Sequence, residues 1–162
     1  PRAQLGYRLS GFWTKVKKRE KTEMSLQAGN LNVGDEHSEV IVHDLSRTQL
    51  VQYAGTSGDY NPLHTDELFA KEVGGYPTVF AHGMLTMGMT GKMLTNWVGD
   101  GRLKTFGLDF RSQVWPGDTL TATAIVTEIT EEDGDQVVKA DVTTCNQNGQ
   151  VVAIGYASAK ID

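Results

Sequence analysis

The first half of the chain combines a short β-branched run with segments that have helical spacing. Residues 39–43 are mostly β-branched and partly alternating, which is typical of a strand. Apolar residues over 47–54 recur at positions that share one helical face, which favours a helix. The pattern therefore predicts, in chain order, a strand at 39–43, a helix over 47–54 capped by Asp44 or Ser46, a break over 55–62 and a second short helix over 66–73.

The longest helical candidate spans 82–98 and ends at the glycine-containing turn 99–101. Its apolar residues lie on all sides of the helix rather than in one stripe, which indicates a buried helix. Three glycines lie within it, although each costs about 1 kcal/mol relative to alanine. Close approach of another backbone would explain Gly83, Gly88 and Gly91.

Beyond residue 101 the hydrophobic period changes to two. Alternating runs separated by turn-forming residues predict strands at 106–110, 120–126, 138–142 and 151–156. Strands joined in sequence by tight turns form an antiparallel sheet. One buried helix ahead of such a sheet predicts an α+β fold, in which the sheet wraps or covers the helix.

Composition and charge limit the functional classes. A chain of 162 residues with 39% hydrophobic and 22% charged residues is expected to form one globular domain. No run approaches the roughly 18 apolar residues of a membrane helix, the N-terminus lacks a secretory pattern, and the single cysteine, Cys145, excludes an internal disulfide. These features predict a cytoplasmic protein without a membrane partner. The net charge of -5 argues against nucleic acid as a partner.

The net charge hides a basic N-terminal segment. Residues 1–23 contain seven Lys or Arg and two Glu, whereas the remainder of the chain is acidic. Met24 could be a natural translation start. Residues 1–23 are therefore interpreted as an extension, either non-native or dispensable for catalysis, with a genuine basic tail as the alternative. The domain is expected to comprise residues 24–162.

Candidate chemistry concentrates between residues 55 and 83. Asp59 and His64 lie five residues apart in the predicted break between helices. A carboxylate and an imidazole can hold one water between them, because each can accept a hydrogen bond from it. The alternative is a structural turn, since Asp, Asn and Pro favour turns and His64 could cap the next helix.

A second candidate lies at the start of the long helix. Gly83 falls in the first turn, where backbone N–H groups have no intrahelical partner. These donors, with the positive end of the helix dipole, suit a thioester oxygen that gains charge during reaction. The alternative is that Gly83 only permits close packing, that His82 caps the helix, and that the methionines form core rather than an acyl-chain site.

Two stretches together resemble a known family. Residues 53–64, Tyr-Ala-Gly-Thr-Ser-Gly-Asp-Tyr-Asn-Pro-Leu-His, and residues 81–88, Ala-His-Gly-Met-Leu-Thr-Met-Gly, are similar to the MaoC-like hydratase/dehydratase family, as is Trp-Val-Gly-Asp at 97–100. The similarity extends over about residues 31–161. The family has the hot-dog fold, in which an antiparallel sheet wraps one long helix. It includes (R)-specific enoyl-CoA hydratases and the catalytic subunit of actinobacterial 3-hydroxyacyl-ACP dehydratases, which this chain resembles closely.

The resemblance implies a set of site residues and a reaction. Asp59 and His64 would be the catalytic dyad, the Gly83 N–H the oxyanion donor, and Asn61 and Ser57 supports of the dyad. The implied reaction is reversible hydration of a trans-2-enoyl thioester to an (R)-3-hydroxyacyl thioester carried on CoA or acyl carrier protein, in fatty-acid metabolism.

The resemblance implies no cofactor, and the histidines show no metal-ligand spacing such as His-x-x-x-His. It also implies a homodimer in preference to a heterodimer with a related subunit. Two other functions on the same fold remain alternatives. One is a thioesterase, and the other is a non-catalytic subunit that binds acyl chains beside an active partner.

Overall fold

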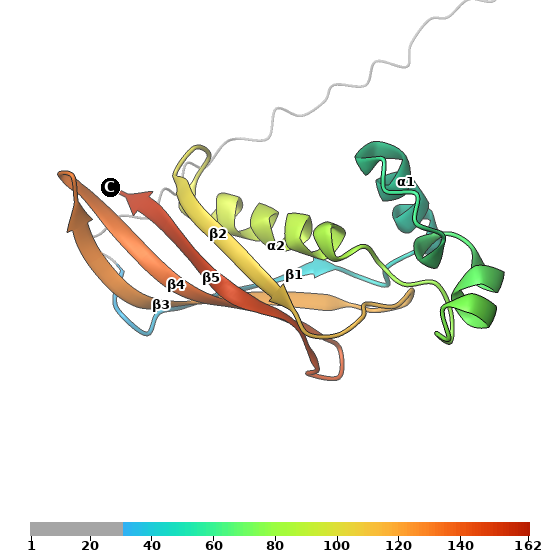
Figure 1. The fold of residues 1–162 in the computed structure, drawn as a ribbon. Helices are drawn as coiled ribbons and strands as arrows, with labels where there is room; N and C mark the ends of the chain where they lie inside the picture. The colour runs from blue at the N-terminus through green and yellow to red at the C-terminus, as the bar shows by residue number, and fades with distance from the viewer. Residues whose placement is uncertain (1–30) are drawn as a thin grey trace, which may run out of the picture.

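The computed structural model describes residues 31–162, so the basic segment 1–23 and Met24 lie outside the described residues. Figure 1 shows one long helix lying against a curved sheet, with smaller helical segments at one end. The elements in chain order are β1 (Glu36–Val42), α1 (Arg47–Ser57), the 3-10 turn η2 (Pro62–His64), the π-helical turn η3 (Phe69–Val73), α2 (Gly83–Val98), β2 (Leu103–Phe110), β3 (Leu120–Glu132), β4 (Asp135–Asn146) and β5 (Val151–Ile161).

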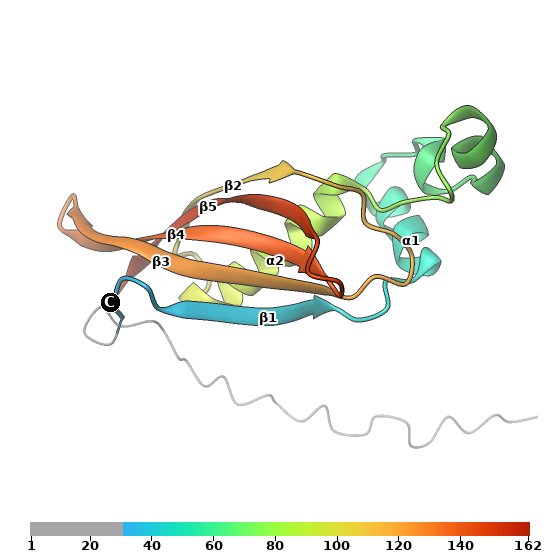
Figure 2. The same ribbon diagram turned by 90° about the horizontal axis from the view of Figure 1, so that it is seen from below.

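The five strands form one antiparallel sheet in the order β1-β3-β4-β5-β2. Figures 1 and 2 show α2 running along one face of this sheet, which curves around it. The β3–β4 turn is formed by Asp133 and Gly134, both at positive φ, as a two-residue hairpin turn requires. These features confirm the predicted α+β hot-dog fold. Among the described residues, no helix has the length and hydrophobicity needed to cross a membrane.

Small side chains on the inner face of the sheet bring α2 close to it. Met93 and Leu94 of α2 are almost completely buried. They pack in one cluster with residues of β3, β4 and β5, most of which are alanine: Ala122, Ala124, Ala140, Val142 and Ala157. Because alanine projects little from the sheet, the helix can bury its larger side chains against these strands.

The prediction that another backbone approaches the glycines of α2 is wrong. Two aromatic rings from β2 occupy these places instead. A Cβ atom at Gly83 would lie 2.9 Å from the ring of Phe110, and one at Gly91 would lie 3.2 Å from the ring of Phe106. Gly88 faces open space, with nothing within 4 Å of such an atom. The glycines at 83 and 91 therefore make room for side chains.

The prediction that α2 is buried on all sides is also wrong for the single chain. Met84, Gly88, Lys92 and Asn96 recur every fourth residue and are all exposed. The sheet covers one side of the helix only, so this row of residues remains on the outside. Met84 is 56% exposed, and the buried residues of α2 include Thr86 and Thr90, which no hydrophobic pattern would have placed inside.

The segment between β1 and α2 differs from its predicted boundaries in two places. Ser46 is the N-cap of α1, where its side chain and that of Gln49 form a capping box. The helix does not break at residue 55; it continues to Ser57 and ends at Gly58, whose φ of 75° is left-handed. The second helix predicted over 66–73 forms mainly as the wider π turn η3, closed by a bond from the Gly74 N–H to the Phe69 carbonyl.

Candidate active site

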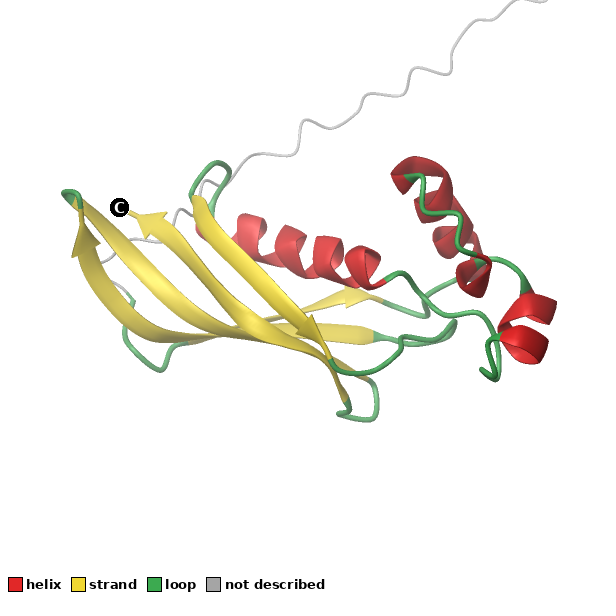
Figure 3. Ribbon diagram, viewed as in Figure 1, coloured by secondary structure: helices red, strands yellow, loops and turns green. Residues whose placement is uncertain are grey.

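The residues singled out in the sequence come together at the N-terminal end of α2. In Figure 3, α1 and the short helical turns lie beyond this end of α2, away from most of the sheet. Asp59 lies in the loop after α1, His64 is the last residue of η2, and Gly83 is the first residue of α2. The fold thus brings two segments of the chain to the place where the helix begins.

Short-range hydrogen bonds fix the loop that carries Asp59. The Ser57 hydroxyl donates to the Tyr53 carbonyl at 2.7 Å and accepts from the Asp59 N–H at 3.2 Å. The Asp59 carboxylate accepts from the Asn61 N–H at 3.2 Å, and the Asn61 side chain accepts from the Leu63 N–H at 3.0 Å, capping η2. Ser57 and Asn61 therefore hold the backbone of the loop, and neither is bonded to the side chain of the other or of His64.

His64 is held by a backbone carbonyl and is only 9% exposed. Its Nδ1 lies 2.7 Å from the Phe80 carbonyl oxygen, which can only accept, so Nδ1 carries the proton. The Nε2 lone pair is then available to a water or substrate. Burial lowers the pKa of His64, and nearby His82 lowers it further, against the raising effects of the Phe80 carbonyl and Asp59. The suggestion that His64 caps a following helix is wrong, because its ring is turned toward Phe80.

His82 completes a cluster that the linear sequence does not reveal. One ligand-type atom each of Asp59, His64 and His82 lies within 4.8 Å of the others. A water that donates to two acceptors at about 2.8 Å from each spans roughly 4.5 to 5 Å, so acceptor atoms within this limit of 4.8 Å are near enough to share one water. The alternative that the His82 side chain caps α2 is wrong, because this side chain makes no capping hydrogen bond. Its Nε2 instead lies 3.0 Å from the Asp59 carbonyl oxygen.

Within the described residues, Asp59, His64 and His82 are also the side chains of metal-ligating type that lie close enough together to be tested as a metal site. The two imidazole rings lie almost face to face, with centroids 3.8 Å apart and planes inclined by 31°. Two histidines on one tetrahedral zinc ion would hold their centroids about 5 Å apart, given Zn–N distances of about 2.0–2.1 Å. The two rings therefore lie too close together to fit one shared zinc ion.

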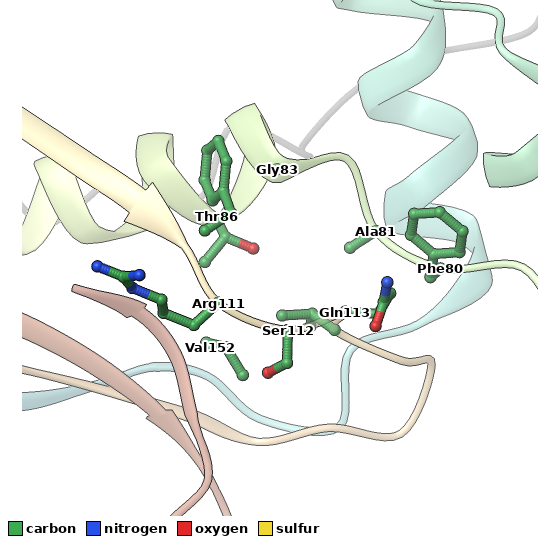
Figure 4. Close-up of a pocket in the computed structure, with 10 residues that line it drawn as sticks. Phe80, Ala81, Gly83, Thr86, Arg111, Ser112, Gln113 and Val152 are labelled. Atoms are coloured by element: carbon green, nitrogen blue, oxygen red, sulfur yellow. The ribbon is translucent and has the colours of Figure 1, made fainter.

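A cavity of about 280 Å³ opens beside Gly83. It is bordered by the segment that leads into α2, by α2 itself, by the end of β2 and the residues that follow it, and by the start of β5: Phe80, Ala81, Gly83, Thr86, Phe110, Arg111, Ser112, Gln113, Val114 and Val152. Figure 4 shows Thr86 and Gln113 entering it from opposite sides. As the first residue of α2, Gly83 has an N–H without an intrahelical acceptor.

Sequence reasoning missed the far wall of this cavity. Residues 111–114 follow the predicted strand 106–110 as an ordinary loop, and nothing in their order marks them as part of a site. The hydrogen bonds from the Arg111 and Ser112 N–H groups to the Val152 carbonyl hold this segment against the start of β5. Only the pairing of β2 with β5 brings the loop to face Gly83.

Comparison with known proteins gives one consistent result. A family model described as a MaoC like domain matches residues 15–148. The (R)-specific enoyl-CoA hydratase of Rhodospirillum rubrum is 32% identical over 132 residues, covering 80% of this chain and 89% of that protein. The 3-hydroxyacyl-thioester dehydratase Y of Mycobacterium tuberculosis is 32% identical over 97 residues, covering 58% of this chain but only 33% of that longer protein.

Solved structures agree with the sequence matches. The (R)-hydratase from A. caviae involved in PHA biosynthesis has a TM-score of 0.72 to this chain at 26% identity, and the match covers 83% of this chain and 100% of that one. Because the family model spans well over half of the chain and the hot-dog architecture is the same, the chain belongs to the family of MaoC-like domains.

Proposed function

We propose that this protein is a hydro-lyase that interconverts trans-2-enoyl thioesters and (R)-3-hydroxyacyl thioesters. The observation that carries the proposal is the clustering of the Asp59 carboxylate and the His64 imidazole with His82, directly before α2, together with the position of Gly83 in the lining of a cavity. The relatives named as an (R)-specific enoyl-CoA hydratase and as a 3-hydroxyacyl-thioester dehydratase support the same reaction in its two directions.

In the proposed mechanism, Asp59 and His64 orient one water. The water donates one hydrogen bond to the Asp59 carboxylate and one to Nε2 of His64, whose Nδ1 proton is committed to the Phe80 carbonyl. The water oxygen attacks C3 of the enoyl group while one water proton passes to the dyad. The C2–C3 π electrons move toward the thioester carbonyl, and the dyad returns a proton to C2, so that H and OH add to one face of the double bond.

The Gly83 N–H is proposed to stabilise the thioester oxygen as it gains negative charge. A backbone donor at the first turn of a helix is preorganised and is reinforced by the helix dipole. No step of this mechanism calls for a metal ion or an organic cofactor, because the carrier's thioester itself accepts the electron density. The carrier is CoA or the phosphopantetheine arm of acyl carrier protein.

The thioesterase alternative differs in the bond that breaks. A thioesterase would direct the water at the carbonyl carbon and release a free thiol, whereas a hydratase leaves the thioester intact. A non-catalytic acyl-binding subunit would change neither bond. The closeness of Asp59 to His64 favours hydration over a non-catalytic subunit, because a subunit that only binds acyl chains has no need of acid-base groups.

An absorbance assay tests the proposal directly. The purified protein is mixed with trans-2-enoyl-CoA substrates of four to sixteen carbons, loss of the enoyl thioester absorbance is recorded, and free thiol is measured in the same sample. Loss of absorbance without thiol, with (R)-3-hydroxyacyl-CoA as product, is expected. Thiol release would favour the thioesterase instead, and no reaction with any chain length on CoA or acyl carrier protein would contradict catalysis altogether.

We further propose that two copies associate through the edges of their sheets, more readily as a homodimer than with a related subunit. β1 and β2 are the two edge strands. Unpaired edge strands present free backbone groups that pair readily with another chain. The end of β2 also borders the cavity at Phe110, so a partner along β2 would lie beside the site.

The free thiol of Cys145 fits a reducing compartment such as the cytoplasm.

A further inference from the structure

His82 is linked to each of the three groups that the proposed reaction uses. Its peptide bond joins it to Gly83, and its Nε2 lies 3.0 Å from the Asp59 carbonyl oxygen. Its ring packs on that of His64, with centroids 3.8 Å apart. On its other side the ring contacts Tyr53 of α1, with a centroid distance of 5.0 Å. One buried side chain thus bridges the loop, η2, α1 and the start of α2.

The hydrogen bonding determines the form of this side chain. Asp59 presents a backbone carbonyl, which only accepts, so Nε2 of His82 carries the proton. The side chain is 2% exposed and its Nδ1 is buried without a hydrogen-bond partner. His82 therefore donates through Nε2 to the Asp59 carbonyl and packs its ring against that of His64.

We propose that His82 is a positioning residue of the reaction: its Nε2–H fixes the Asp59 backbone relative to Gly83, and its ring sets the plane of the His64 imidazole. This inference rests on the proposed function. His82 does not touch the reacting atoms. It acts by holding Asp59, His64 and Gly83 in fixed positions relative to one another, although these residues come from segments that are separate in the chain. Small displacements matter for such an arrangement, because a misplacement of about 1 Å can reduce a rate by about 10²-fold.

Matched variants separate this role from simple stabilisation of the fold. His82→Gln keeps an N–H donor near the position of Nε2, whereas His82→Leu fills similar space without a donor. Thr90→Val is the control, because it removes a buried hydrogen bond to Thr144 from the same helix without contacting the dyad. Each variant is tested for kcat, KM and melting temperature.

We expect His82→Leu to lower kcat at least about 10-fold with KM changed by less than about 3-fold, because alignment affects the chemical step rather than binding. His82→Gln should restore kcat to within about 5-fold of wild type, and Thr90→Val should keep the wild-type kcat while lowering the melting temperature. Equal losses in the Gln and Leu variants, or a loss in the Leu variant no larger than in Thr90→Val, would overturn the inference.

Nuclear magnetic resonance of the histidine rings gives a test that needs no activity and no altered fold. In the wild-type protein the ¹⁵N shifts should show His82 protonated at Nε2 and bare at Nδ1; the opposite tautomer would overturn the inference even if no Leu variant folds. The His64 ring signals should move in His82→Leu and not in Thr90→Val. A wild-type protein that hydrates no thioester would contradict the proposed function, whereas unchanged His64 signals in His82→Leu would contradict the positioning role alone.

Discussion

At the residue scale, the two histidines of the site carry their protons on opposite ring nitrogens. His64 donates from Nδ1 to the Phe80 carbonyl, and His82 donates from Nε2 to the Asp59 carbonyl. In both cases a backbone carbonyl selects the tautomer, because it can only accept. The result is one imidazole whose free lone pair serves the proposed water and another whose free lone pair is buried. Two chemically identical side chains thereby acquire different roles.

The dyad is tested by Asp59→Asn and His64→Ala. Asparagine keeps the shape of aspartate but is not a base, and alanine removes the second group that holds the water. Each should lower kcat on enoyl thioesters by at least about 10²-fold with little change in melting temperature. The double variant should be scarcely worse than the slower single one, because both residues act on one water. A folded single variant that works at nearly the wild-type rate would show that the assignment is wrong.

The pH dependence of the rate follows from the environment of His64. Burial lowers the pKa of this imidazole below its ordinary value of 6.5. Since the mechanism needs the neutral form, the midpoint of the acid limb of the kcat/KM profile should lie below pH 6.5. The profile of kcat/KM against pH measures this, because it reports the groups of the free enzyme. A midpoint at or above 6.5 would contradict the role of His64 as the neutral acceptor.

The same shift affects stability with a definite sign. Because the pKa is lower in the folded than in the unfolded protein, the unfolded state takes up the proton first as the pH falls. The shift therefore contributes to the free energy of unfolding above pH 6.5, and this contribution is lost as the pH falls below that value. Urea unfolding at several pH values should show this loss in the wild type and a smaller one in His64→Ala.

At the element scale, the two ends of α1 determine where the dyad loop lies. The helix begins at the capping box of Ser46 and Gln49, in which the Ser46 hydroxyl accepts from the Gln49 N–H and the Gln49 side chain accepts from the Ser46 N–H. It ends at left-handed Gly58, directly before Asp59. Leu50 on its inner side is fully buried, which fixes the helix against the core. The loop is therefore anchored by an element with defined ends.

Ser46→Ala tests the stabilising role of this cap. Loss of the Ser46 acceptor should lower the free energy of unfolding by about 1 kcal/mol, within the usual range for N-caps. Thr48→Ala is the matched control, because Thr48 is exposed in the same turn; it should change the free energy by less than about 0.5 kcal/mol. Urea unfolding followed by circular dichroism measures both. A Ser46 variant as stable as the control would show that the capping box does not stabilise the folded protein.

At the scale of the whole molecule, the sheet covers only one side of α2, and the opposite side of the helix is exposed in the single chain. The exposed row on α2 and the two edge strands leave apolar and backbone groups uncovered in the single chain. Met84 on α2 and Phe110 at the end of β2 are both exposed, and Phe110 borders the cavity. A second copy along β2 would cover such groups near the site.

Sedimentation velocity tests this association. A chain of 17.7 kDa should sediment at micromolar concentration with twice that mass. The sheet edge is the expected contact, because edge strands are the surfaces that pair between chains. A monodisperse monomer that retains full activity would rule out both the dimer and any need of the site for a partner.

Features that depend on near neighbours in the chain could be predicted from the amino-acid sequence. Alternation with period two and the turn residues between runs predicted the sheet, since strand formation and tight turns follow from local side-chain pattern and φ preference. The closeness of Asp59 to His64 could also be predicted from the sequence. The intervening Asn61 and Pro62 form a compact turn that is stabilised by its own side chains. Helix ends were less well predicted: Gly55 did not end α1, because helical hydrogen bonds continued through it to Gly58.

Contacts between groups that are distant in the chain depend on how the folded elements pack together. His82 reaches Asp59 and His64 because η2 packs on the start of α2, and residues 111–114 face Gly83 because β2 pairs with β5. The exposed row on α2 likewise depends on how far the sheet curves around the helix, which no single segment encodes. Such contacts join residues far apart in the chain, and they form only when the buried faces of helix and sheet are packed together.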